Sequence, residues 1–221
     1  NMERILEPEL MDSEAQTEAY ARADFDEPNR LFVEAFCQRF GDAGAGSTAL
    51  DLGCGPADIV IRLAERYPAC QVTGADAGQN MLRQAEAAVR SSAAAERVSL
   101  TLCRLPDLAG LTPPYDAIVS NSLLHHLPRA ETLWKAVRNL GAPGTRVMIM
   151  DLRRPKDREA ARAIVETYSG DEPDVLKEDF ESSLCAACTP EEIDAQLGEH
   201  GLERLEVIIP SDRHVMVAGV L

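Results

Sequence analysis

The chain has 221 residues, of which 45% are hydrophobic and 27% charged, so its composition is that of a folded globular protein rather than a disordered or fibrous one. Its 37 acidic residues against 22 Lys and Arg give a formal net charge of -15, which disfavours DNA, RNA and anionic membranes as partners. No apolar run reaches the ~20 residues that span a bilayer, and no basic and apolar leader is visible, so we expect a cytoplasmic protein.

Two amphipathic stretches open the chain, at about residues 13–23 and 28–40. In the second stretch the apolar residues that recur at helical spacing are Leu31, Phe32, Ala35, Phe36 and Phe40. We therefore expect residues 1–46 to form an N-terminal helical cap, followed by one larger domain at residues 47–221.

Short strand-like runs then alternate with helical stretches as far as residue 151. The strand-like runs cover residues 47–52, 70–76, 97–102, 115–121 and 145–151, and the helical stretches cover residues 58–67, 79–94 and 129–140. Such alternation predicts βαβ units with right-handed crossovers. We expect a doubly wound α/β fold, with a parallel sheet and helices on both faces.

The rest of the chain begins with an acidic helical region that extends to about residue 183. A further helix opens at Thr189 and Pro190, and two strands follow at residues 202–210 and 213–221. The connection between these strands is too short for a crossover, so we expect an antiparallel C-terminal hairpin.

The first strand runs directly into a glycine turn that contains Gly53, Cys54 and Gly55. Glycines at a strand end let the backbone approach a ligand closely. A dinucleotide fingerprint favours a third glycine where Asp58 stands, and the Asp51 carboxylate is unfavourable beside a pyrophosphate. The carboxylate suits a ligand that carries an ammonium and a sulfonium, so the charge favours S-adenosyl-L-methionine over NAD.

A second acid, Asp76, ends the next strand-like run about twenty residues further along, where a carboxylate can accept both hydrogen bonds of a ribose diol. Two acids at strand ends are a more specific pattern than the glycine turn alone. With these residues the chain resembles the class I S-adenosylmethionine-dependent methyltransferases over residues 48–151. The resemblance implies a Rossmann-like, seven-stranded sheet with a reversed last strand.

The resemblance also implies how the cofactor is held. The glycine turn and Asp51 line the methionine moiety, and Asp76 holds the ribose. Ala77 and Met81 lie along the ribose and adenine, and the stretch that begins with Asn121 and Ser122 forms the wall near the sulfonium.

One position departs from the family pattern. Many members carry an aspartate near the adenine amino group after the third strand, whereas this chain has Arg104, which cannot accept that hydrogen bond. Backbone groups of Arg104 and Leu105 remain available to frame the base.

Four side chains are candidates for substrate binding or catalysis, each with a plainer alternative. His125 fits a general base, or a residue that closes the turn after the fourth strand. Arg153 and Arg154 follow the fifth strand, where either fits a bidentate clamp for a substrate carboxylate or a neutralising group on an acidic surface. Tyr20, in the cap, fits a residue that closes over the ligands or an exposed helix residue.

The six cysteines do not form a disulfide framework. Cys185 and Cys188 make a CxxC motif, but no second CxxC or histidine pair lies nearby in the sequence, so we interpret them as buried core residues. No metal site is expected.

The resulting hypothesis is methyl transfer to a small-molecule acceptor by in-line attack on the sulfonium methyl group. The acceptor is anionic if the arginines clamp it. The alternatives are another S-adenosylmethionine-using enzyme of this fold, which modifies the cofactor or transfers its aminopropyl arm, and a non-catalytic cofactor-binding regulatory subunit. The sequence names neither the acceptor nor the methylated atom, and it leaves a homo-oligomer open.

Overall fold

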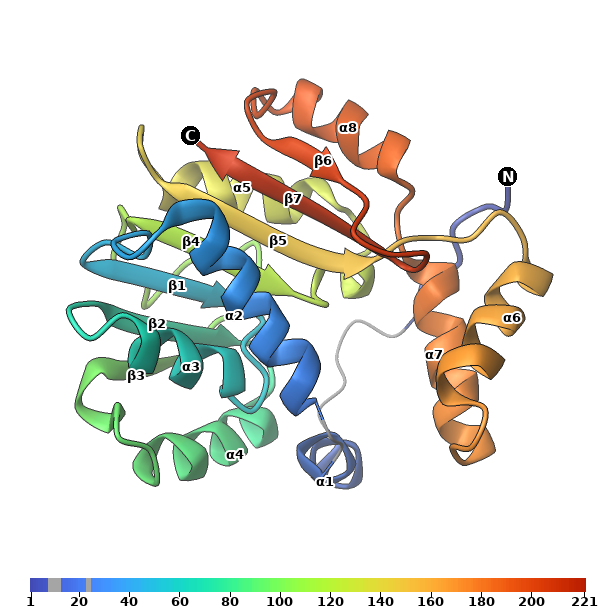
Figure 1. Cartoon of the computed structure of the whole chain (residues 1–221), viewed down its shortest axis with the longest axis horizontal. Coiled ribbons are helices and arrows are strands. Elements are labelled where there is room, and N and C mark those ends of the chain that lie inside the picture. The colour runs from blue at the N-terminus through green and yellow to red at the C-terminus, as the bar shows by residue number, and fades with distance from the viewer. Residues whose placement is uncertain (8–12, 23–24) are drawn as a thin grey trace.

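A computed structural model describes residues 1–7, 13–22 and 25–221, and seven strands form one sheet at its centre (Figure 1). The strands are β1 (Thr48–Leu52), β2 (Gln71–Asp76), β3 (Val98–Leu102), β4 (Ala117–Asn121), β5 (Arg146–Leu152), β6 (Glu206–Ile208) and β7 (His214–Val220). Their order is β3-β2-β1-β4-β5-β7-β6, and β7 is antiparallel to both of its neighbours. The expected doubly wound sheet with a C-terminal hairpin is confirmed.

Helices cover both faces of the sheet. The helices are α1 (Glu14–Arg22), α2 (Asp26–Phe40), α3 (Asp58–Arg66), α4 (Gln79–Arg90), α5 (Glu131–Leu140), α6 (Arg158–Ser169), α7 (Asp174–Ala186) and α8 (Pro190–Glu199), with short 3-10 turns η1 (Ala95–Arg97) and η2 (Leu124–His126). Apolar residues of α2, α3 and α4 share one buried cluster, and those of α5 and α8 share another. Ala49 and Leu50 of β1 lie in opposite clusters, because successive strand residues point to opposite faces.

The N-terminal region contains two helices but is not helical throughout. Residues 1–7 form neither helix nor strand and hydrogen-bond to Lys156 and Cys185, whereas α2 buries Phe32, Val33 and Phe36 in the cluster that it shares with α3. The end of the first expected helix, at residue 23, lies outside the described residues. The domain boundary at residue 46 stays a prediction.

Three predicted boundaries differ from the structure. The helix expected at residues 79–94 ends at Arg90, because Ser91 and Ser92 donate hydroxyl hydrogen bonds back to carbonyl groups of α4. The acidic helical region is two helices, α6 and α7, broken near Gly170 and Pro173. The strand expected at residues 202–210 shortens to Glu206–Ile208, because the chain first makes a turn in which the Leu205 N–H bonds to the Leu202 carbonyl.

The α6–α7 hairpin lies beyond the carboxyl edge of the sheet, close to the N-terminus (Figure 1). Its buried residues, with Met2 and Leu152 packed against them, form a small apolar cluster separate from the two that flank the sheet. Among the described helices, none combines the length and apolarity that crossing a membrane requires.

Candidate functional site

A cleft of about 480 Å³ opens at the carboxyl end of β1. It lies at the point where the strand order reverses between β1 and β4, which is where ligands bind in open α/β sheets. The predicted site residues that line it are Tyr20, Asp51, Gly53, Cys54, Gly55 and Asn121. The structure therefore brings the glycine turn, the first acid and the end of β4 together.

The glycine turn is compact because several of its residues adopt left-handed backbone conformations. The φ angles of Gly53, Gly55 and Ala57 are 73°, 53° and 70°. A Cβ atom on Gly53 would lie 3.1 Å from Cβ of Leu123, so a side chain there would be crowded by the segment after β4 and strained by the positive φ. The turn thus presents backbone to the cleft.

Asp51 is a buried carboxylate that lacks a protein partner for one oxygen. The residue is 2% exposed, and its Oδ1 has no hydrogen-bond partner within the described part of the chain. Burial, with the nearby charge of Asp76, raises the pKa of this carboxyl well above its ordinary value. An unpaired buried acid is unfavourable. A cationic ligand at this oxygen would supply the missing partner.

Asp76 joins the two turns that border the predicted cofactor site. Its Oδ2 accepts a hydrogen bond of 2.9 Å from the Gly55 N–H, and its Oδ1 accepts one of 2.8 Å from the Gly78 N–H. A carboxylate oxygen can accept more than one hydrogen bond, so this role is compatible with binding a ribose diol.

Tyr20 lies beside the two acids. Its ring stacks on Phe25 with centroids 4.7 Å apart, and a Cβ on Gly55 would lie 3.7 Å from its Cε1. Burial, together with the charges of Asp76 and Asp51, raises the pKa of the phenol to about 12. We predicted Tyr20 as a substrate residue, but the structure places it against the glycine turn, on the side expected for the cofactor.

Cys54 lines the cleft and packs its side chain against β2. Its Sγ lies 2.9 Å from the position that a Cβ on Gly74 would take, and its N–H donates to the Ala75 carbonyl at 3.0 Å. Burial, then the charges of Asp51 and Asp76, raises the pKa of the thiol. Cys54 therefore lies in the core at the edge of the cleft.

The remaining predicted cofactor residues follow the carboxyl ends of β2, β3 and β4 without lining the described cleft. They are Ala77, Met81, Arg104, Leu105 and Ser122. Ser122 has a φ of 60°, a conformation that residues with a side chain adopt rarely, as the chain leaves β4. The cofactor contacts of these five residues stay predictions.

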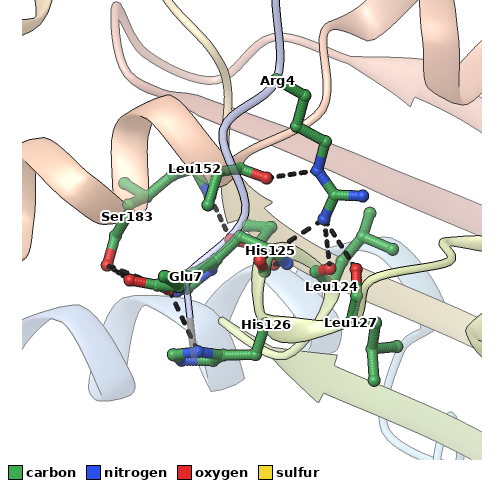
Figure 2. A network of polar contacts seen from close by, with 10 residues as sticks. Arg4, Glu7, Leu124, His125, His126, Leu127, Leu152 and Ser183 are labelled. Carbon is green, nitrogen blue, oxygen red and sulfur yellow. Dashed lines mark hydrogen bonds and ion pairs between the residues drawn. The ribbon is translucent and has the colours of Figure 1, made fainter. Parts of the chain in front are cut away.

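His125 follows β4 and lies between the carboxylates of Asp151, in β5, and of Glu7, in the N-terminal segment. Figure 2 shows Glu7 beside the two adjacent histidines. Its Nδ1 is 2.6 Å from Oδ1 of Asp151, and its backbone N–H donates to Oδ2 of the same residue at 3.0 Å. Its Nε2 is 3.2 Å from Oε1 of Glu7. Burial lowers the pKa of the imidazole, but the charges of Asp151 and Glu7 outweigh burial and raise it. This environment favours the turn-closing interpretation over that of a general base.

The first seven residues hold the same region and were not singled out from the sequence. Arg4 donates to the carbonyl oxygen of Ala186 at 2.5 Å and to that of Leu127 at 2.8 Å, from 123 residues away along the chain (Figure 2). Burial acts to raise the pKa of Glu7, yet a hydrogen bond to His126 and the charges of both histidines lower it. No local motif marks Arg4 or Glu7. Asp151, by contrast, could have been identified from the sequence, because it ends a strand-like run that is expected to be parallel to the one that His125 follows.

The two candidate clamp arginines have different surroundings. Arg153 is half-buried beside the C-terminal hairpin, where its Nε donates to the Ser211 carbonyl at 3.3 Å. Arg154 is 7% exposed, donates to the Met2 carbonyl at 2.9 Å and the Ala187 carbonyl at 2.7 Å, and pairs through both Nη groups with Glu192. The proposed clamp is wrong for Arg154, because these internal partners occupy its guanidinium.

Cys185 and Cys188 are both buried and unpaired as a disulfide. Burial raises the pKa of both thiols, which disfavours the thiolate that redox or metal chemistry needs. Their surroundings agree with the interpretation as core residues.

Comparison with known proteins places this geometry in context. Residues 49–144 match a family model described as a methyltransferase domain. A ubiquinone/menaquinone biosynthesis C-methyltransferase from Desulfotalea psychrophila is 31% identical over 126 residues, which are 57% of this chain and 48% of the relative. A trans-aconitate 2-methyltransferase from Streptomyces avermitilis is 39% identical over 80 residues, which are 35% of this chain and 29% of the relative. The chain thus spans less than half of either relative.

Solved structures share the fold at low sequence identity. A putative S-adenosyl-L-methionine-dependent methyltransferase from Methanococcus maripaludis superposes with a TM-score of 0.73 at 16% identity, covering 98% of each chain. This agreement extends over the C-terminal hairpin as well as the stretch that the family model matches.

Proposed function

Because residues 49–144 match a methyltransferase-domain model and the fold is shared with a solved S-adenosyl-L-methionine-dependent methyltransferase, we propose that this chain belongs to the class I S-adenosylmethionine-dependent methyltransferases, binds S-adenosyl-L-methionine in the cleft and methylates a small, acidic molecule. The observation that carries the proposal is the buried Asp51 carboxylate, whose Oδ1 lacks a hydrogen-bond partner among the described residues. A ligand ammonium would satisfy that oxygen, and a pyrophosphate would repel it.

The residues of the cleft fit this cofactor. When bound, S-adenosyl-L-methionine supplies a methyl group activated by a positively charged sulfur. Asp51 binds the ammonium, Asp76 orients the ribose, and Tyr20 covers the glycine turn and excludes water from it. Methyl transfer of this kind depends more on the alignment of the acceptor with the methyl group than on acid-base chemistry. It therefore does not require His125 to act as a general base.

An acidic acceptor is supported by two observations. One matched relative is named for trans-aconitate, a carboxylate, and Arg153 follows β5 at the same edge of the sheet as the cleft. Among the described residues, the side chain of Arg153 forms a hydrogen bond through Nε, which leaves its two Nη groups to pair with a carboxylate. Arg154 is no longer part of this proposal.

The test has a binding step and a product step. Calorimetry on the parent protein should show saturable binding of S-adenosylhomocysteine and no response to NAD; tight NAD binding without a response to the sulfur ligand would overturn the proposal.

Acidic metabolites would then be screened with S-adenosyl-L-methionine, with product masses read by mass spectrometry. A methyl adduct supports methyl transfer, whereas an aminopropyl adduct or a modified cofactor supports the other enzymes of this fold. Cofactor binding without turnover, together with cofactor-dependent control of a partner, supports the regulatory subunit.

A further inference from the structure

Residues 1–7 lie across the 3-10 turn that follows β4, which brings Glu7 above two adjacent histidines (Figure 2). The Met2 N–H donates to the Lys156 carbonyl at 2.9 Å, and the Ile5 N–H donates to the Cys185 carbonyl at 3.0 Å. Ser183 donates to the Glu7 carboxylate at 3.3 Å. These bonds fix the position of the carboxylate.

Three ligand-type atoms from this region converge on one point. Oε1 of Glu7 lies 3.2 Å from Nε2 of His125 and 3.1 Å from Nδ1 of His126, and all three atoms lie within 4.8 Å of one another. Ligand atoms about 2.0–2.2 Å from a tetrahedral zinc ion are separated by roughly 3.3–3.6 Å. The two contacts of the Glu7 oxygen are close to this spacing, and the two histidine nitrogens lie within 4.8 Å of each other.

The contacts of His125 direct its second ring nitrogen at Glu7. Because Nδ1 makes the short contact with Asp151, Nε2 is the ring atom that faces the Glu7 oxygen, at 3.2 Å. A proton or a metal ion between these two atoms satisfies both of them. Nδ1 of His126 is also buried and lies 3.1 Å from the same Glu7 oxygen.

The surroundings of the cluster match those of a metal centre. Histidine ligands commonly donate their second ring N–H to a carboxylate, which orients the ring and increases its basicity. Asp151, which is 2% exposed, stands in that relation to His125. Two imidazoles with one carboxylate suit zinc and its first-row neighbours, whereas magnesium and calcium favour oxygen ligands.

We propose that Glu7, His125 and His126 bind one divalent transition-metal ion, for which zinc is the best fit, and that the ion fastens residues 1–7 to the turn after β4. This site was not expected from the sequence, because Glu7 is remote from the histidines along the chain. Three protein ligands leave one position of a tetrahedral ion open. The inference does not depend on methyl transfer.

The experiment uses the full chain after treatment with a chelator and removal of the chelator. Zinc binding is measured by calorimetry, and cobalt is then added in its place so that visible absorption reports the ligands. The test variants are Glu7→Gln and His126→Ala, since both side chains are only partly enclosed. The matched controls are Glu3→Gln, in the same segment, and His200→Ala, at the end of α8.

We expect the parent and both controls to bind one zinc ion. Each test variant should bind zinc at least about 100-fold more weakly, which exceeds the 10–100-fold effect typical of losing a second-sphere partner. The cobalt form should show tetrahedral nitrogen and oxygen ligation without thiolate charge-transfer bands. Lack of stoichiometric binding in the parent, binding of equal strength in the test variants, or thiolate bands that reveal a cysteine site would each overturn the proposal. Because no S-adenosyl ligand is present, these outcomes are independent of cofactor binding.

Discussion

Two neighbouring parts of the carboxyl edge of the sheet are built in different ways. At the carboxyl ends of β1 and β2, the two acids of the proposed cofactor site lie in the strands themselves, Asp51 just before the glycine turn and Asp76 at the end of β2. At the carboxyl ends of β4 and β5, Arg4 and Glu7 arrive from the N-terminus and Glu192 from α8. The first region has a local sequence signature, and the second is assembled from remote segments.

The two regions also differ in how their charges are satisfied. Asp51 is left with an unpartnered oxygen among the described residues, which marks a place for a ligand. Arg154 is surrounded by protein acceptors and stabilises the fold. A buried charge therefore indicates a ligand site only where the protein itself does not pair it.

The largest expected effect tests the assembled region. Replacing Arg154 with methionine should lower the free energy of unfolding by about 3 kcal/mol, because Glu192 and two carbonyl groups lose a buried cation. Arg153→Met is the matched control and should change stability by no more than about 0.5 kcal/mol. Urea unfolding of both variants measures the difference. Equal stability of the two variants would contradict the structural role of Arg154.

The next effect tests the local region. Asp51→Asn should weaken binding of S-adenosylhomocysteine by about 2–3 kcal/mol, because a charge-assisted hydrogen bond to the ammonium is lost. The ligand-free variant should be at least as stable as the parent, since a buried charge without a partner has been removed. Calorimetry measures the affinity and thermal unfolding measures the stability, with Asp171→Asn, at an exposed position, as the control. Parental affinity in Asp51→Asn would mean that the cleft does not bind the ammonium there.

The same residue predicts a pH dependence with a definite sign. The pKa of Asp51 is raised in the folded protein, so the folded state holds this proton more tightly than the unfolded state. Its contribution therefore favours folding at low pH and diminishes as pH rises from the ordinary aspartate value through the folded pKa. The stability advantage of Asp51→Asn over the parent should grow across this window. If the difference between the unfolding free energies of Asp51→Asn and the parent stayed constant across this pH range, the pKa of Asp51 would not be raised in the folded protein.

Asp76 should affect binding and folding together. Asp76→Ala removes the acceptor for the N–H groups of Gly55 and Gly78, so the ligand-free protein should lose about 2 kcal/mol of stability, and cofactor affinity should fall as well. Urea unfolding and calorimetry on the same preparation measure both quantities. Affinity unchanged from the parent would remove Asp76 from the cofactor site.

The smallest expected effect concerns the acceptor. With an acidic acceptor in hand, Arg153→Ala should reduce kcat/KM by a factor that corresponds to about 1.5 kcal/mol, while cofactor affinity is retained. Arg153→Lys should recover only part of the loss, because lysine keeps the charge but not the planar fork. If the alanine variant kept the parental kcat/KM, or if every acceptor found were uncharged, Arg153 would not bind the acceptor as proposed.

The sequence predicted the sheet, its order of helices and strands, and the pairing of Asp51 with the glycine turn, because each is encoded by neighbouring residues. It did not predict Glu7, whose contact with His125 is created only when the chain folds. It also misjudged Arg154, because position on the sheet edge says nothing of which groups pack against a side chain. The sequence also made β6 too long, because residues with a strand-like pattern near Leu202 form a turn in the structure.

A crystal structure with S-adenosylhomocysteine tests the central claim most directly, because it locates the ligand atom that partners the buried acid. Our account expects the ligand in the cleft between β1 and β4, with its amino group about 2.7–3.2 Å from Oδ1 of Asp51 and its ribose diol on Asp76. Electron density for the ligand elsewhere, or an amino group directed away from Asp51, would contradict it.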